Sequence, residues 1–290
     1  MISLHPDVVR APKHGALLLR GAIAACLLLA ALAFAGWAVA QVAVIPALLV
    51  LFTLIALGSA LPTLGIFAQP ILAGPPNQPF VALTFDDGPD AKNTQRVLDL
   101  LRNTPHRATF FVIGQRAEQQ PALIAAIAAD GHLLGNHSFS HNNFTPALPA
   151  SALVAELRRT SKLLAGLTGQ TIQWFRPPVG LITPPVAEAA RRAGLQLVVW
   201  SATARDGVAW ASATSALDAL VKGMKPGAIL VLHDGVASQP GQVPVVLQIL
   251  PEVLAQLDKH GLRSVTLDAL LVDDPKASQG PVLDQHENAM

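Results

Sequence analysis

The sequence predicts an α/β domain with a parallel sheet, preceded by an N-terminal membrane segment. Of its 290 residues 51% are hydrophobic and only 13% are charged, and residues 21–67 include no Asp, Glu, Lys or Arg. After residue 80, short apolar runs alternate with amphipathic stretches, which is typical of a parallel sheet that is open or closed into a barrel. Polar residues follow the ends of several of these runs, where α/β barrels build their active sites.

The uncharged run is long enough for two membrane helices. The apolar region of a signal peptide spans about 7–15 residues, and a membrane span needs about 20. We expect one helix near residues 17–38 and a second near residues 42–64, with a hairpin turn close to Gly36, Gln41 or Pro46. One long kinked helix or a buried core is the alternative. The membrane interpretation predicts an integral protein of the plasma (inner) membrane, with the lipid bilayer as a partner.

The side of the membrane on which the following domain lies depends on the number of spans. Arg10, Lys13 and Arg20 precede or begin the first helix, and the next basic residue is Lys92. The positive-inside rule therefore places the N-terminus in the cytoplasm. One span would place the domain outside and two would return it to the cytoplasm, so both remain open.

Composition divides the chain into five segments. They are an N-terminal tail (1–16), the membrane segment (17–68), a Pro-rich connector (69–79), the α/β domain (80–272) and a tail expected to be disordered (273–290). Because the net charge is only +1 and the basic residues are scattered, nucleic acid is not an expected partner. Cys26 is the only cysteine, so an intramolecular disulfide is excluded.

The elements of the α/β domain follow from its apolar pattern. Strands are expected at residues 81–85, 108–112, 133–136, 174–176, 195–200, 228–232 and 262–265. Helices are expected at residues 93–102, 121–129, 150–167, 184–193, 213–222 and 245–260. Glycines at 131, 169, 194 and 261 come just after four of these helices, the position at which glycine commonly ends a helix.

Two adjacent carboxylates, Asp86 and Asp87, end the first strand of this domain. Charges at the end of a buried strand are costly unless they are compensated. His137 and His141 are four residues apart, and on a helical turn their Cβ atoms would lie about 5–6 Å from each other. One carboxylate and two imidazoles form a catalytic divalent-metal site with open positions. The second carboxylate is then free to act as a base.

Each of these residues also has a purely structural interpretation. The two aspartates could form an Asx-turn or a helix cap, the two histidines could be ordinary turn residues, and Arg176 could be an ion-pair partner. Ser138 is interpreted as a cap of the turn that carries the histidines. Three further histidines, at positions 106, 132 and 260, are expected at the surface or at helix caps.

From residue 80 to about residue 271 the chain resembles the polysaccharide deacetylases with a NodB-homology domain, carbohydrate esterase family 4. The motifs are Thr-Phe-Asp-Asp-Gly-Pro (84–89), His-Ser-Phe-Ser-His (137–141), Arg-Pro-Pro-Val-Gly (176–180) and Leu-Val-Leu-His (230–233). A fifth motif, around Asp206, is partly kept. The resemblance implies a distorted (β/α) barrel and metal-dependent removal of N-acetyl groups from N-acetylhexosamines.

The same resemblance implies a metal site and a general base. Asp87, His137 and His141 would hold a divalent ion, Zn²⁺ first and Co²⁺, Ni²⁺ or Mn²⁺ as alternatives. Asp86 would accept a proton from the attacking water. Arg176 would orient that base, and its positive charge favours the ionised carboxylate.

It also implies a general acid and an oxyanion site. His233 would protonate the departing amine, with Asp206 as the partner that raises the pKa of the imidazole. A backbone N–H near Val179 would stabilise the oxyanion. Family members commonly have an aromatic residue in place of Val179 and a tryptophan in place of Gly207, so these positions bear on substrate choice.

These observations lead to three functional hypotheses. The first is a membrane-anchored, metal-dependent N-deacetylase acting on peptidoglycan, a chitin-like oligosaccharide or an exported polysaccharide. The second is a deformylase or deacylase of a polyprenyl-linked sugar, which the membrane segment and the missing aromatics favour. The third is an inactive glycan-binding protein, against which the intact set of acidic and histidine residues argues. The expected partner is a glycan or a lipid-linked amino sugar.

Overall fold

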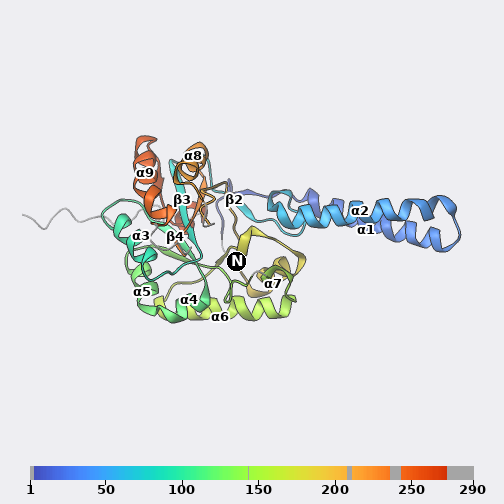
Figure 1. Ribbon diagram of the computed structural model, residues 1–290, viewed down its shortest axis with the longest axis horizontal. Coiled ribbons are helices and arrows are strands. Elements are labelled where there is room, and N and C mark those ends of the chain that lie inside the picture. Colours follow the sequence, from blue (N-terminus) through green and yellow to red (C-terminus); the bar gives the residue numbers. More distant parts are fainter. Residues whose placement is uncertain (1–2, 143, 208–210, 236–242, 273–290) are drawn as a thin grey trace, which may run out of the picture.

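The computed structural model describes residues 3–142, 144–207, 211–235 and 243–272. Its centre is an eight-stranded parallel sheet that curls into part of a barrel, with strand order β7-β6-β5-β4-β3-β9-β8 and with β10 beside β3 (Figure 1). The strands are β3 (Phe80–Asp86), β4 (Ala108–Val112), β5 (Leu133–Asn136), β6 (Trp174–Phe175), β7 (Gln196–Leu197), β8 (Ala202–Thr203), β9 (Ile229–His233) and β10 (Arg263–Ser264). The predicted α/β fold with a parallel sheet is confirmed.

Helices follow most of the strands and cover the outside of the sheet (Figure 1). They are α3 (Asn93–Arg102), α4 (Gly114–Gln119), α5 (Pro121–Ala129), α6 (Ala150–Thr168), α7 (Pro184–Ala193), α8 (Ala213–Gly223), α9 (Val245–Lys259) and α10 (Leu267–Leu271). The largest core lies between the central strands and these helices, and includes Leu83, Phe85 and Phe110 with Leu98 and Leu250. The alternate residues Ala82 and Phe111 are buried in a second cluster, so both faces of the sheet are covered, which explains the uninterrupted apolar runs of β3 and β4.

Two long helices, α1 (His14–Phe34) and α2 (Ala38–Ala60), run antiparallel and project from the α/β domain as a hairpin (Figure 1). The turn between them contains Gly36 with φ of 86°, a left-handed conformation that glycine adopts without strain. Both helices begin and end a few residues before the expected boundaries, because this turn lies at the start of the Gly36–Pro46 region rather than at its centre. Both are long and apolar enough to cross a membrane.

The N-terminal tail and the Pro-rich connector pair with each other. The short strand β1 (Val9–Arg10) is antiparallel to β2 (Ile71–Ala73), which lies within the expected connector. A short 3-10 helix, η1 (Pro62–Leu64), precedes β2. These strands have two and three residues, too few to show an apolar alternation in the sequence.

Two further features differ from the sequence-based expectations, and one expectation falls outside the described residues. The apolar run 195–200 forms only the short strand β7, at one edge of the sheet. The chain then continues into a separate strand, β8, which pairs with β9 at the opposite edge. Helix α4 was not expected, because its six residues are too short for a helical pattern. The tail at 273–290, expected to be disordered, lies outside the described residues.

Candidate active site

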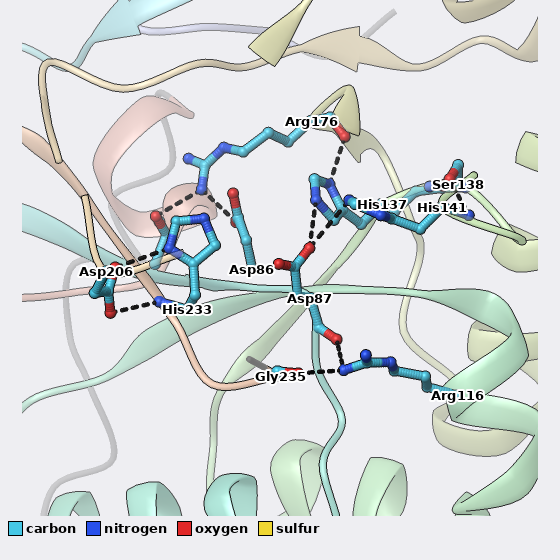
Figure 2. A network of polar contacts seen from close by, with 12 residues as sticks. Asp86, Asp87, Arg116, His137, Ser138, His141, Arg176, Asp206, His233 and Gly235 are labelled. Carbon is cyan, nitrogen blue, oxygen red and sulfur yellow. Dashed lines mark hydrogen bonds and ion pairs between the residues drawn. The ribbon is translucent and has the colours of Figure 1, made fainter. Parts of the chain in front are cut away.

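The carboxyl ends of the central strands bring the candidate site residues together (Figure 2). Asp86 ends β3 and lies in register with His233, which ends β9. Asp87 follows β3 directly, His137 follows β5, and Arg176 follows β6. All seven side chains expected at the site from the sequence therefore lie in one cluster at the same edge of the sheet.

Asp87, His137 and His141 form a cluster that could hold a metal ion. The Nε2 atoms of the two histidines lie 3.3 Å and 3.1 Å from the same Asp87 oxygen, Oδ1. One donor atom from each residue can be chosen so that all three lie within 4.8 Å of one another. Two imidazole nitrogens and one carboxylate oxygen are the donor set of catalytic zinc and related divalent ions.

The segment 137–141 is a non-helical turn, so the expected helical turn is wrong. The rings of His137 and His141 still lie 4.9 Å apart, because two residues of the turn have left-handed backbone: Ser138 with φ of 65° and His141 with φ of 47°. The Ser138 hydroxyl accepts the backbone N–H of His141 at 3.2 Å, consistent with the capping role expected for this serine. Glu156 on α6 accepts the Ser140 hydroxyl at 2.7 Å and holds the turn against that helix.

A backbone carbonyl fixes the orientation of the first histidine. Nδ1 of buried His137 lies 2.7 Å from the carbonyl oxygen of Arg176, so Nδ1 carries the proton and donates it to that oxygen. Nε2 is then the unprotonated nitrogen and faces Asp87, as a metal ligand requires.

The charges within this cluster stabilise one another. Burial tends to raise the pKa of Asp87, but hydrogen bonds and charges from His137 and His141 more than offset it and hold that pKa well below its usual range. Burial tends to lower the pKa of His141, but Asp87 raises it above its ordinary value. A negative carboxylate therefore persists at this position at any physiological pH.

Asp86 is buried and paired with a buried arginine. NH1 of Arg176 donates to Asp86 Oδ1 at 2.7 Å and to the Thr84 hydroxyl at 2.8 Å, and NH2 donates to the Val199 carbonyl at 3.1 Å. The guanidinium also lies over the ring of Phe111, 4.1 Å from its centroid. Both partners of this pair are shielded from water, so the pairing compensates a charge that burial alone would penalise.

His233 and Asp206 form a second pair on the other side of Asp86. Nδ1 of His233 lies 2.8 Å from Asp206 Oδ1, and the backbone N–H of His233 donates to Asp206 Oδ2 at 3.1 Å. Burial tends to lower the pKa of His233, but the hydrogen bond and charge of Asp206 raise it to about 9. The imidazole therefore carries two protons at neutral pH and can donate one.

The two positions that depart from the family pattern lie beside these groups. Val179 has φ of 53° and an exposed side chain. The next residue, Gly180, also has a positive φ, and a Cβ there would come within 2.5 Å of the Trp200 ring. A Cβ at Gly207 would lie 3.0 Å from Nε2 of His233. The absence of a side chain at 207 thus leaves the reactive nitrogen of His233 uncovered on that side.

Two residues of this region were missed by the sequence reasoning. Arg116 on α4 donates to the carbonyl oxygens of Asp87 at 2.8 Å and Gly235 at 2.6 Å, so it joins the loops after β3 and β9 (Figure 2). Asp234 is fully buried behind Gly88 and accepts the hydroxyl of Thr94. The only sequence signal for Asp234 was its position directly after His233.

The three histidines outside the motifs follow two different patterns, and His260 is exposed at the end of α9, as expected. His106 and His132, expected at the surface or at caps, are buried. Each accepts a backbone N–H at Nδ1, from Ser264 and Ala108 respectively, both at 3.1 Å. Their contacts therefore connect neighbouring strands and do not contribute to the candidate site.

Comparison with known proteins gives consistent results. The sequence model of the family described as polysaccharide deacetylase matches residues 73–198. The chain is 37% identical over 199 residues to a peptidoglycan-N-acetylglucosamine deacetylase of Bacillus cereus, covering 68% of this chain and 90% of that protein. It is 33% identical to a chitooligosaccharide deacetylase of Rhizobium leguminosarum bv. trifolii, covering 67% of this chain and 84% of the relative. Among solved structures, a family 4 carbohydrate esterase from Streptomyces lividans in complex with acetate is 32% identical, with a TM-score of 0.58, covering 68% of this chain and 97% of the other.

Proposed function

Because this chain belongs to the polysaccharide deacetylase family, carbohydrate esterase family 4, we propose that it is a membrane-anchored, metal-dependent hydrolase that removes N-acetyl groups from amino sugars of a glycan. The observation that carries this proposal is the arrangement of Figure 2, in which a buried aspartate lies between a candidate metal cluster and a protonated histidine. The activity named for both sequence relatives is deacetylation of an amino-sugar glycan.

The residues present fit a divalent ion. Asp87, His137 and His141 are the proposed ligands, with Zn²⁺ as the expected ion. Asp87 stays ionised, and the Arg176 carbonyl orients His137 with its free nitrogen toward the cluster. When bound, such an ion polarises the acyl carbonyl and lowers the pKa of a water molecule to about 7.

Asp86 is the proposed general base. The water oxygen forms a bond to the acyl carbon while its proton passes to the Asp86 carboxylate. NH1 of Arg176 donates to Oδ1 of Asp86, so Arg176 fixes the orientation of the carboxylate and leaves Oδ2 to accept the proton. The carboxylate is the form of Asp86 that can accept the proton.

His233 is the proposed general acid. The carbon–nitrogen bond breaks as the amine nitrogen takes a proton from Nε2 of His233, and Asp206 stabilises the doubly protonated imidazole before that transfer. The backbone N–H near Val179 is the proposed donor to the oxyanion. Asp206 thus raises the pKa of the proposed acid, and Arg176 orients the proposed base.

Membrane anchoring by the α1–α2 hairpin is the remaining part of the proposal. The two helices have 21 and 23 residues, and at about 1.5 Å per residue each reaches across the roughly 30 Å hydrocarbon core of a bilayer. Hardly any of either helix is buried against the protein, unlike the core helix of a soluble domain. The proposed catalytic unit comprises residues 80–272.

The proposal is tested with the full chain purified in detergent. Release of a free amine is measured on N-acetylglucosamine oligomers and on their N-formyl counterparts, with added Zn²⁺ and with a chelator. We expect metal-dependent release with the acetyl substrate preferred. Preference for the formyl substrate would change the acyl group and keep the mechanism. Tight metal binding without release from either oligomer would exclude these soluble substrates and leave a lipid-linked amino sugar or the inactive glycan-binding hypothesis.

A further inference from the structure

We propose that the α1–α2 hairpin crosses the plasma membrane twice, that the α/β domain lies on the cytoplasmic side, and that the substrate is an N-acylated amino sugar linked through phosphate to a lipid of that leaflet. This inference rests on the proposed function and goes beyond it by naming the side of the membrane and the carrier of the sugar.

The chain before α1 is attached to the domain that follows α2. β1 pairs with β2, and the backbone N–H of Ala11 donates to the Pro70 carbonyl at 3.1 Å. Further toward the N-terminus, the N–H of His5 donates to the carbonyl of Leu271 at 2.8 Å. The residues on both ends of the hairpin are therefore on the same side of any membrane that the hairpin enters. A single span, which would place the domain on the opposite side from residues 5–11, is incompatible with these contacts.

The hairpin behaves as one apolar unit. The turn at Gly36 lies at the end farthest from the domain (Figure 1). Close to it, the Gln41 side chain donates to the Ala33 carbonyl at 3.4 Å, and near mid-length the Cys26 thiol donates to the Ala47 carbonyl at 3.4 Å. These bonds satisfy polar groups inside the unit. The outward side chains are large and apolar, among them Leu17, Leu27, Phe34, Val42 and Phe52, each more than 60% exposed.

The charges lie at one end of this unit. Arg10, Lys13 and Arg20 are at or near the base, where the hairpin joins the domain, and the 35–37 turn at the tip has no charged side chain. The positive-inside rule assigns the basic end to the cytoplasm. Combined with the pairing of β1 and β2, this charge distribution places the candidate active site in the cytoplasm as well.

The candidate active site lies close to the base of the hairpin. The backbone N–H of Ile182, three residues after Val179, donates to the carbonyl of Ser59 in the last turn of α2 at 3.1 Å. The next residue, Thr183, donates its hydroxyl to the Pro146 carbonyl at 2.7 Å, which links the same segment to the turn at Phe144. The loop proposed to supply the oxyanion donor is thus bonded directly to a membrane helix.

The loops on this side of the site present apolar side chains to their surroundings. Phe144 is 74% exposed and Val179 is 72% exposed. Exposed apolar side chains next to a membrane helix are well suited to lie against lipid. A site in this position meets amino sugars before export, when they are carried on a nucleotide or on a lipid phosphate. The apolar rim and the bond to α2 favour the lipid carrier.

The side of the membrane is tested without any measurement of activity. Two single-cysteine variants are made in a Cys26→Ser background: Ala35→Cys at the hairpin tip, and Ser151→Cys at an exposed position of α6. Their reaction with a membrane-impermeant maleimide is compared on spheroplasts of the expressing bacterium. We expect Ala35→Cys to react in intact spheroplasts and Ser151→Cys only after lysis. Reaction of Ser151→Cys in intact spheroplasts overturns the proposal, and so does reaction of Ala35→Cys only after lysis.

The carrier is tested with the full chain in mixed micelles. Amine release is compared for N-acetylglucosaminyl phosphoryl polyprenol, UDP-N-acetylglucosamine and an N-acetylglucosamine pentamer. We expect kcat/KM to be at least about tenfold higher for the lipid-linked sugar, the scale of an added apolar contact. Equal or better turnover of either soluble substrate overturns the lipid carrier. Failure of all three with metal bound would instead overturn the deacylase function itself, while the labelling result still decides the side.

Discussion

The carbonyl oxygen of Arg176 lies 2.7 Å from Nδ1 of His137, so one residue positions both halves of the site. Its guanidinium holds Asp86, and its backbone fixes the tautomer of a proposed metal ligand. This relationship depends on β5 and β6 being neighbours in the sheet, because the two residues directly follow those strands. Small displacements of the β6 end would therefore disturb the proposed base and the proposed metal site together.

The side chain and the backbone of Arg176 can be separated by substitution. Arg176→Lys keeps the backbone carbonyl and a positive charge but cannot contact Asp86, Thr84 and Val199 at once. We expect kcat to fall by about 100-fold, as for a misaligned catalytic group, with metal affinity retained. Steady-state kinetics and metal content of the same preparation check this. Loss of bound metal in the folded variant would show that the Arg176 side chain, and not only its backbone carbonyl, supports the metal site.

The two histidines are expected to determine metal content. His137→Gln and His141→Gln each remove an imidazole from the cluster with Asp87, and Zn²⁺ should bind at least about 10-fold more weakly, since even indirect supports of a ligand carry such losses. Competition with a chromophoric chelator measures the affinity. His260→Gln is the matched control, because His260 is exposed on the C-terminal end of α9 and should leave binding unchanged.

The pH dependence of kcat/KM should reflect the ionisation of His233. Its pKa is raised to about 9, so the protonated acid persists across neutral pH and the alkaline fall of kcat/KM should lie near pH 9. In Asp206→Asn the main cause of that rise is removed, and the fall should move by more than about one pH unit toward the ordinary value for histidine. Asp218→Asn, on the exposed side of α8, should keep the original profile.

The same pair affects stability, with a defined sign. Because the pKa of His233 is higher in the folded chain than its ordinary 6.5, the stability gained from the pair is fully present below about pH 6.5 and is lost as the pH rises through about 9. If the alkaline fall of kcat/KM stays near pH 9 in folded Asp206→Asn, a group other than His233 is the general acid.

Buried Asp234 should make the fold less stable at high pH. Burial raises its pKa to about 7, against an ordinary 3.8, so the folded chain keeps the neutral acid where the unfolded chain is already ionised. Stability should thus decline between about pH 4 and pH 7 and stay lower above. Asp234→Asn removes this ionisation, and we expect a smaller difference in Tm between pH 5 and pH 8 than in the parent or in Asp218→Asn. An unchanged difference would contradict this assignment.

The strand ends were the predictable part of the site. Asp86, Arg176 and His233 each follow a strand recognisable from its apolar run, and parallel pairing then brings them to one edge. The turn at 137–141 was not predictable, because its shape depends on left-handed Ser138 and on Glu156, a residue on α6. The four-residue spacing predicted correctly that His137 and His141 lie side by side, but through a helical turn that does not form.

Non-local pairing explains the other differences. β1 and β2 form only because residues far apart in the sequence meet at the base of the hairpin. His106 and His132 read as surface residues because the strands that bury them come from distant parts of the chain. Each of these features is decided by tertiary contacts rather than by local pattern.

In the proposed mechanism, Asp86 acts as a base beside a metal held by Asp87 and the two histidines. This mechanism is tested most directly by stripping the full chain of metal, titrating it with Zn²⁺, and following acetate release from N-acetylglucosamine substrates, soluble and lipid-linked, in the parent and in Asp86→Asn. We predict that release in the parent rises with bound Zn²⁺, and that Asp86→Asn binds Zn²⁺ equally well but loses at least about 100-fold in rate. Release that persists in the chelated parent, or that is equal in Asp86→Asn, would contradict the account.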